Sequence, residues 1–261
     1  MNTENNTVQK SSFIKELDQK LLDKEFFLQI LNRDQLKYIA LILMTFGHWA
    51  LKLRNIIRPR ALVRFAISAE FFAPFVFFFF ISEGYYYTRD RKKYALRLLI
   101  CALITQIPHT LTIPDYTLKT FFLQWSVIMT LFLGLLALMV LHSSWKLPVR
   151  LAAIAGLMGV SWLIKAEWFV SGIIVIICLD LLRNKPLLRF AVLEVLTYAV
   201  MCTQVQGFPD STIFIRYFLP PMIAGVVITF FYNGKKGHFP VFSKYFFYIW
   251  YPLHLLLELF F

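Results

Sequence analysis

The sequence contains few charged residues for its length. Only 16% of its 261 residues are Asp, Glu, Lys or Arg, whereas about 25% is usual in a soluble domain. Its hydrophobic share is 59% and its mean hydropathy is +0.63, compared with a hydrophobic share of about 45–50% in soluble domains. These proportions exclude an ordinary soluble domain.

Cysteines and the motifs of soluble enzymes are also scarce. Cys101, Cys178 and Cys202 lie inside apolar runs without a CxxC pair or His/Cys spacing, so we expect buried thiols and no metal site. The sequence lacks G-x-G-x-x-G, Walker, G-x-S-x-G and H-E-x-x-H motifs, which disfavours hydride transfer, nucleotide hydrolysis and serine hydrolysis by the usual routes. Residues 1–34 lack the apolar core of a cleavable signal peptide, so none is expected.

Long apolar segments dominate the rest of the chain. They cover residues 36–53, 62–83, 94–108, 119–141, 150–165, 168–183, 187–204, 213–232 and 241–261. About 20 apolar residues suffice to cross a bilayer as a helix. We therefore predict an all-α transmembrane bundle of about nine spans, with eight to ten as the range. The third, fifth and sixth segments are short, and a re-entrant pair is the alternative around Lys165-Ala166-Glu167.

The polar N-terminal segment is expected to form an amphipathic helix within Ser11–Asp34. Its apolar residues recur near helical spacing among charged ones, at Phe13, Leu17, Leu21, Leu28 and Leu31. Such a helix lies on the membrane surface or on the bundle. The expected organisation is a cytoplasmic segment over residues 1–34 followed by a bundle over residues 35–261.

The excess of positive charge is placed between the apolar segments. In a soluble protein, a net charge of +12 and a pI near 9.7 would suggest a nucleic-acid partner. Here the positive residues lie between long apolar segments, which is typical of a membrane protein, so no nucleic-acid partner is expected. Across nine spans, 18 Lys and Arg fall on the side of the N-terminus and seven on the other, with Arg97 and Arg216 inside spans. The positive-inside rule predicts a cytoplasmic N-terminus in a multi-pass inner-membrane protein, with Phe261 outside.

Polar residues inside apolar segments are the candidates for function, because they are costly in a bilayer. With the predicted orientation, residues from seven segments converge on the outer half of the membrane: His48, Glu70, Gln106, Gln124, Ser126, Glu167, Arg216 and His254. This convergence indicates a site.

Structural roles for the same residues stay open. His254 is equally explained as a hydrogen-bond donor between helices, and Glu70 as the ion-pair partner of Arg64 or Arg216. We expect Phe77-Phe78-Phe79-Phe80 to be lipid-facing or packing surface. The charged run Arg89–Lys93 is either a positive-inside anchor or a site for the phosphates of an anionic cofactor.

Several strings, in order over about 220 residues, are similar to those of one family. They are Leu36-Lys37-Tyr38-Ile39-Ala40 with Met44-Thr45 and His48, Ala73-Pro74-Phe75, Glu83-Gly84-Tyr85, Thr88-Arg89, Arg91-Lys92-Lys93-Tyr94, Arg97-Leu98, Thr105-Gln106-Ile107-Pro108, Thr130-Leu131 with Gly134-Leu135, Glu167, and Tyr248 to Leu255. Together they resemble the TraX family.

This resemblance implies an inner-membrane acetyltransferase, because the family is named for the protein that acetylates the N-terminus of conjugative pilin. Lys37 and His48 also show the Lys/Arg-x10-His spacing of the wider group of transmembrane acyltransferases that modify cell-surface glycans, in which the histidine is catalytic. The family typically has Asp directly before this histidine, whereas this chain has Gly47. Either Glu70 supplies the carboxylate from the next span, or the activity is weakened or lost.

Acetyl transfer from a thioester needs a base, an electropositive group for the oxyanion and a site for the coenzyme A phosphates. We expect His48 to be the base, oriented by Glu70 or Glu167. His254 or Arg216 is expected to stabilise the oxyanion. The residues expected to bind acetyl-CoA at the cytoplasmic side are Lys37, Glu83, Arg89, Arg91, Lys92, Lys93 and Arg97.

The expected partners are the lipid bilayer and an acceptor, either a glycan or a pilin-like peptide. The sequence leaves open the acceptor's identity, O- or N-acetylation and the oligomeric state. Two alternative functions stay in view. A transporter predicts polar residues in both halves of the membrane and inverted repeats, which are not evident, and a degenerate scaffold is supported only by Gly47.

Overall fold

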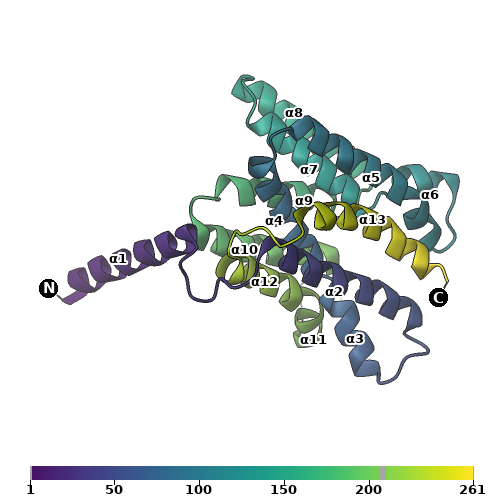
Figure 1. The fold of residues 1–261 in the computed structure, drawn as a ribbon, viewed down its shortest axis with the longest axis horizontal. Coiled ribbons are helices and arrows are strands. Elements are labelled where there is room, and N and C mark those ends of the chain that lie inside the picture. Colours follow the sequence, from purple (N-terminus) through teal and green to yellow (C-terminus); the bar gives the residue numbers. More distant parts are fainter. Residues whose placement is uncertain (1, 206–209, 261) are drawn as a thin grey trace.

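The computed structural model describes residues 2–205 and 210–260, which form a bundle of helices (Figure 1). In chain order the elements are α1 (Asn2–Asp23), α2 (Arg33–Leu53), α3 (Arg60–Ala69), α4 (Phe72–Tyr87), α5 (Arg91–Thr112), α6 (Leu118–Leu123), α7 (Val127–Leu141), α8 (Leu147–Leu163), α9 (Phe169–Leu181), α10 (Pro186–Val205), α11 (Ser211–Ile213), the π-helix η1 (Phe214–Phe218), α12 (Leu219–Val226), the π-helix η2 (Val227–Phe231) and α13 (Pro240–Glu258).

Six helical segments of the described chain are long and apolar enough to cross a membrane. They are Arg33–Leu53, Arg60–Tyr87, Arg91–Thr112, Leu118–Leu141, Pro186–Gln204 and Ser211–Phe231. The all-α transmembrane class is therefore confirmed, whereas the count of nine spans is not. The third apolar segment, expected to be short, is part of a 22-residue helix, while α8 and α9 have only 17 and 13 residues.

Helix α4 lies at the centre of the bundle, packed against α2, α7, α9 and α12. Phe75, Phe78 and Phe79 on this helix are at most 2% exposed. Burial of such large apolar rings stabilises the fold by about 1.5–3 kcal/mol each. The phenylalanine run is thus mainly packing surface inside the protein, and the ring of Trp168 completes it by edge-to-face contact with Phe75 and Phe78.

Helix breaks occur inside two of the long segments and place polar groups within the bundle. Glu70 lies at the break between α3 and α4, and Ser126 precedes α7 after a short interruption that follows α6. The segment Ser211–Phe231 contains two π-helical stretches, a rare geometry that is frequent at functional sites.

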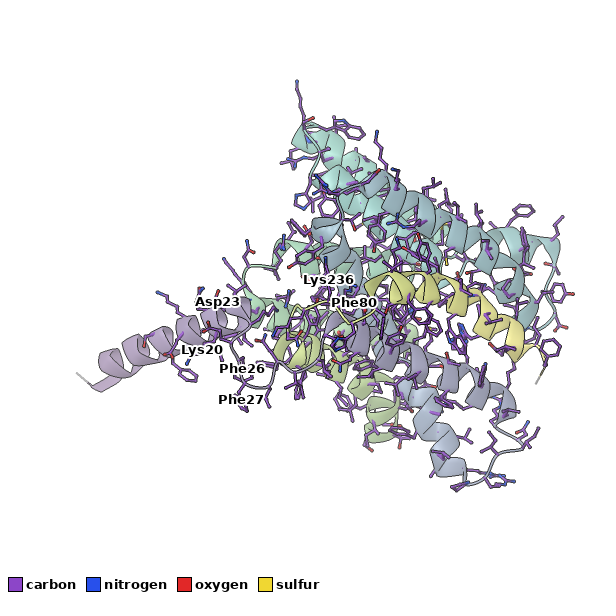
Figure 2. All side chains as sticks on the ribbon, viewed as in Figure 1. Lys20, Asp23, Phe26, Phe27, Phe80 and Lys236 are labelled. Carbon is purple, nitrogen blue, oxygen red and sulfur yellow. The ribbon has the colours of Figure 1, made fainter. Side chains whose placement is uncertain are left out.

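The N-terminal helix differs from the one expected over Ser11–Asp34. Helix α1 ends at Asp23, so Leu28 and Leu31 lie outside it, and Phe13 is 64% exposed while Leu21 is buried. Figure 1 shows α1 projecting from the bundle. In Figure 2, Phe26 and Phe27 lie on the segment after α1, far from the centrally placed Phe80. A continuous amphipathic helix over this region is therefore not confirmed.

Candidate active site

Two cavities lie along α2, one near each end. The first, which we call the basic cavity, has a volume of about 380 Å³. Its charged lining comprises five cations and two carboxylates: Arg33, Lys37, Arg97, Lys236, Lys244, Asp34 and Glu83. Its aromatic lining includes Phe80, Tyr87, Tyr94, Tyr232, Phe247 and Tyr248. A cavity of this kind suits an anionic ligand that also carries an aromatic ring.

The cations of the basic cavity are held over aromatic faces. The Lys37 Nζ lies 4.7 Å from the ring centroid of Phe80 and 5.6 Å from that of Phe247. The Arg97 guanidinium lies 5.9 Å from the ring centroid of Tyr94. Because aromatic faces attract cations, these contacts keep both charges at the cavity wall.

The second cavity, which we call the histidine cavity, has a volume of about 520 Å³. It is lined by the polar side chains of His48, Glu70, His109, Gln124, Lys165, Glu167 and Gln204, with Trp125 and Trp168 among its aromatic residues. The structure therefore brings together three of the catalytic residues predicted from sequence, His48, Glu70 and Glu167. Val127 and Tyr251 line both cavities, so the two cavities adjoin at this pair.

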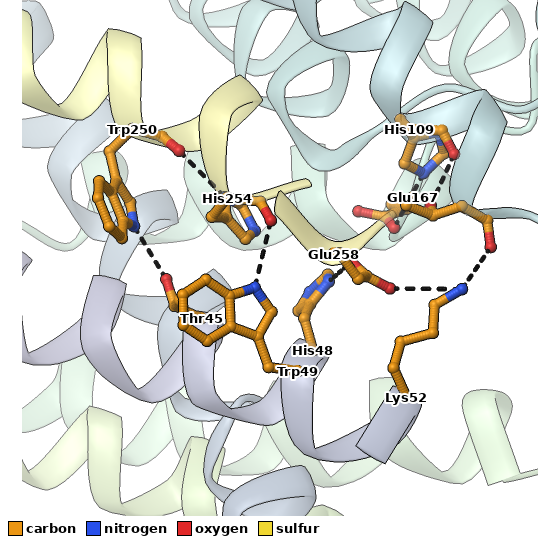
Figure 3. A network of polar contacts seen from close by, with 10 residues as sticks. Thr45, His48, Trp49, Lys52, His109, Glu167, Trp250, His254 and Glu258 are labelled. Carbon is orange, nitrogen blue, oxygen red and sulfur yellow. Dashed lines mark hydrogen bonds and ion pairs between the residues drawn. The ribbon is translucent and has the colours of Figure 1, made fainter. Parts of the chain in front are cut away.

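His48 projects from α2 toward the last turn of α13 (Figure 3). Its Nδ1 lies 3.5 Å from the Glu258 Oε2, and the other carboxylate oxygen of Glu258 lies 3.7 Å from the Lys52 Nζ. The ring of His48 also faces that of His254 edge to face, with centroids 5.4 Å apart. One buried carboxylate thus lies between an imidazole and an ammonium group of the same helix.

His254 is fully buried beside the histidine cavity. Its Nδ1 lies 3.2 Å from the carbonyl oxygen of Trp250, and the indole Nε1 of Trp49 donates to the carbonyl oxygen of His254 at 3.2 Å. The indole Nε1 of Trp250 donates to the Thr45 hydroxyl at 3.0 Å (Figure 3). Within the described residues the Nε2 of this buried ring has no hydrogen-bond partner.

Glu167 is held rigidly in the connection between α8 and α9. Its backbone N–H donates to the Trp125 carbonyl oxygen at 2.8 Å, and its Oε2 accepts from the Val127 N–H at 2.8 Å. Its Oε1 lies 3.4 Å from the His109 Nε2. The carboxylate therefore caps the start of α7, where the helix dipole favours negative charge. Three nearby residues have positive φ, at 46°, 65° and 39°: Lys165, Trp168 and Phe169. Such strain in non-glycine residues clusters at functional sites.

Glu70 lies directly against Gly47. A Cβ built on Gly47 comes 2.4 Å from both the Cβ and the Oε2 of Glu70, and 3.0 Å from the carbonyl oxygen of Ala66. No side chain fits at position 47 unless α3 moves away from α2. The carboxylate of Glu70 thus occupies the space next to His48 that a side chain at position 47 would need.

The remaining predicted residues lie outside these cavities. The Arg216 guanidinium lies 5.0 Å from the ring centroid of Tyr217, and the Arg91 guanidinium 4.0 Å from that of Tyr85. Arg89, Lys92 and Lys93 are exposed at the start of α5. Asp90 caps this helix, and the Lys93 backbone N–H that it accepts holds the pKa of its carboxyl below the usual range. This run is organised as a helix start, and only Lys37, Glu83 and Arg97 of the predicted cofactor residues line the basic cavity.

Sequence reasoning missed two ionisable residues of the site, His109 and Glu258. His109 directly follows Pro108 at the end of an apolar segment, and Glu258 comes four residues after His254, on the same helical face. That spacing was the available signal for Glu258. Its partner on α2, however, is set by how the two helices pack.

Comparison with known proteins identifies the lineage of this arrangement. The family model described as TraX protein matches residues 32–260, which include every residue lining the two cavities. The chain belongs to the TraX family. A similar protein is the probable fimbrial assembly protein FimC, serogroup H1, of Dichelobacter nodosus, which is 30% identical over 237 residues, covering 85% of this chain and 92% of that relative. No solved structure matches the chain. In this TraX-family protein, α1 therefore lies outside the matched region, whereas both cavities lie within it.

Proposed function

We propose that this protein is an integral membrane acetyltransferase that moves an acetyl group from cytoplasmic acetyl-CoA to a hydroxyl or amine acceptor. The supporting observation is a pair of adjoining cavities, one basic and aromatic, the other carrying His48 with carboxylates. The five cations of the basic cavity suit the phosphates of coenzyme A, and its aromatic rings suit the adenine. Family membership supports the same class of function.

The predicted orientation agrees with this arrangement. With a cytoplasmic N-terminus, the start of α2 places Lys37 on the side where acetyl-CoA is made, and His48 lies three turns further outward on the same helix. The thioester arm would then pass Val127 and Tyr251 to reach His48. The acceptor, a glycan or a pilin-like peptide, would enter the histidine cavity from the outer side.

The proposed reaction uses His48 as the base. His48 takes the proton of the acceptor hydroxyl or neutral amine while the acceptor oxygen or nitrogen attacks the thioester carbonyl carbon. A bond from the acceptor to the acetyl carbon forms, the carbon–sulfur bond breaks, and the departing sulfur receives the proton that His48 holds. His254 and Arg216 stay the predicted groups for stabilising the oxyanion, but neither is among the residues that line the histidine cavity. The Nδ1 of His254 lies 3.2 Å from the Trp250 carbonyl oxygen, so this ring must be protonated before its Nε2 can donate to an oxyanion.

The scaffold alternative depends on Gly47, where the family typically has Asp. The Glu70 carboxylate occupies the space beside position 47. The chain therefore lacks the Asp carboxylate at position 47 but has the Glu70 carboxylate next to it. This arrangement favours an active enzyme over a degenerate scaffold.

The test is release of free coenzyme A thiol from acetyl-CoA added to inside-out vesicles that were sealed with cell lysate inside them, because the lumen of such a vesicle corresponds to the outer side from which the acceptor would enter. We expect wild-type vesicles to release thiol and His48→Ala vesicles to lose at least ~100-fold of that rate, since general-base catalysis contributes about 10²–10⁴-fold. The matched control is His238→Ala, because His238 is exposed in the connection before α13. Equal rates in all three samples would contradict the proposal.

A further inference from the structure

We propose that Glu258, in the last turn of α13, is the positioning residue that orients His48 in the transfer reaction. This inference rests on the proposed function, since it assigns the partner of the proposed base. The carboxylate comes from the far end of the chain, 210 positions after the histidine, rather than from the residue beside it.

The geometry singles out one carboxylate. Glu258 Oε2 lies 3.5 Å from the His48 Nδ1, and the Glu258 side chain is 5% exposed, whereas that of His48 is 31% exposed and lines the histidine cavity. A carboxylate at ion-pair distance from Nδ1 favours the tautomer with its proton there, which leaves Nε2 to take a proton from the acceptor.

The other carboxylates near His48 make no ion pair with it in the described chain. The carboxylate of Glu70 abuts Gly47, and that of Glu167 accepts from the Val127 N–H and contacts His109. The ring of His254 lies edge-on to that of His48, with ring centroids 5.4 Å apart. Glu258 is the carboxylate within contact distance of a ring nitrogen of His48 in the described chain.

Lys52 completes the arrangement one helical turn beyond His48. Its Nζ lies 3.7 Å from the Glu258 Oε1 and donates to the Thr112 carbonyl oxygen at 3.2 Å. A buried carboxylate without a counter-charge is strongly destabilising. Lys52 therefore balances the Glu258 charge while His48 is neutral, and Glu258 gains a second positively charged partner when His48 takes up the proton.

Helices α2 and α13 hold this contact by a series of polar contacts along their length. The Trp250 indole donates a hydrogen bond to the Thr45 hydroxyl, and the Trp49 indole donates one to the His254 carbonyl oxygen (Figure 3). Glu258 forms ion pairs with His48 and Lys52. The first two contacts fix the register of the helices, so that the last turn of α13 lies beside His48. Removing the Glu258 charge should leave this register intact.

The test uses Glu258→Gln, which keeps the size of the side chain and removes its charge, in the full-length protein in membrane vesicles. The first readout does not need catalysis. It is the rate at which diethyl pyrocarbonate modifies His48, followed by peptide mass spectrometry between pH 5 and 8. Because a carboxylate favours the protonated imidazole, which does not react, the pH of half-maximal modification should fall by about 0.5 units or more in the variant. The matched control, Glu194→Gln on α10, should leave it unchanged.

The second readout is thiol release from acetyl-CoA. We expect Glu258→Gln to lower kcat about tenfold or more with little change in KM for acetyl-CoA, and Glu258→Asp to recover part of the rate. Thermal unfolding checks that each variant is folded, and the pair Glu258→Gln with Lys52→Met, which removes both partners of the ion pair together, replaces Glu258→Gln if the latter does not fold. An unchanged pH of modification in a folded charge-removed variant, or an unshifted kcat, overturns the assignment of Glu258. Absence of thiol release by wild-type vesicles overturns the proposed function instead, and the modification profile still decides whether Glu258 acts on His48.

Discussion

At the scale of single residues, the glycine directly before His48 has a physical explanation. Gly47 packs so closely against Glu70 and the backbone of Ala66 that any added side chain overlaps them. The residue that fits at position 47 therefore depends on the residue at position 70, and the reverse also holds. Couplings between contacting residues commonly amount to about 0.5–3 kcal/mol.

This coupling makes a prediction for an exchange of carboxylates. Gly47→Asp alone should destabilise the protein by about 1–3 kcal/mol through overpacking and abolish thiol release. The pair Gly47→Asp with Glu70→Gly relieves the overlap with the Glu70 side chain and places a carboxylate directly before His48, so stability should be regained and activity partly restored. The measurements are thermal unfolding and thiol release. A double variant as impaired as the sum of the two single variants would contradict the coupling.

A second prediction at the residue scale concerns Tyr251. Its buried ring lines both cavities and lies edge to face with His254 at 5.1 Å. If the acyl group passes this residue, Tyr251→Ala should raise the kcat/KM ratio of butyryl-CoA to acetyl-CoA by about tenfold, the effect of roughly 1.4 kcal/mol at one pocket wall. The control is Tyr245→Ala, which removes an exposed tyrosine of the same helix. An unchanged ratio would exclude Tyr251 from acyl selection.

At the scale of elements, α2 carries both Lys37 of the basic cavity and His48 of the histidine cavity. The first turn of this helix sets where both residues lie. The Asn32 side chain accepts from the N–H groups of Asp34 and Gln35, while the Gln35 side chain accepts from the Asn32 N–H. This capping box satisfies backbone groups that the helix leaves unpaired. It fixes where α2 begins, and therefore where Lys37 and His48 lie.

Asn32→Ala should cost about 1 kcal/mol, because an unsatisfied N-cap typically costs about 0.5–2 kcal/mol. For a chain of this size we expect a fall in Tm of about 2–4 °C in detergent. Asn55→Ala, in the exposed turn after α2, is the matched control and should leave Tm unchanged. Equal Tm values for both variants would show that the capping box contributes nothing.

The helices also show how far sequence pattern reached at this scale. Apolar length and composition located nearly every long helix, because the hydrophobic requirement of a bilayer is expressed residue by residue. The ends of helices were less well located. Residues 91–93 and 109–112 are helical although they lie outside the expected apolar segment, and the cap by Asp90 accounts for the extension at the N-terminal end.

At the scale of the whole molecule, the predicted orientation is open to a direct test. A cysteine replacing Lys92, in the exposed first turn of α5 after the connection from α4, should react with a membrane-impermeant maleimide only in inside-out vesicles. A cysteine replacing Asn55, between α2 and α3, should react only in right-side-out cells, because one long segment separates the two connections. Both are placed in a background without Cys101, Cys178 and Cys202. Labelling of both from the same side would contradict the proposed path of the acetyl group.

Local patterns in the amino-acid sequence are enough to identify a helical membrane protein of the TraX family and to place Lys37 and His48 on one helix, because membrane helices and short motifs are local. Which side chains meet follows from the packing of the helices. This packing places Glu258 beside His48, Glu70 beside Gly47, and Val127 with Tyr251 between two cavities. These contacts join residues far apart in the chain, and they follow from how whole helices pack, which no local pattern encodes.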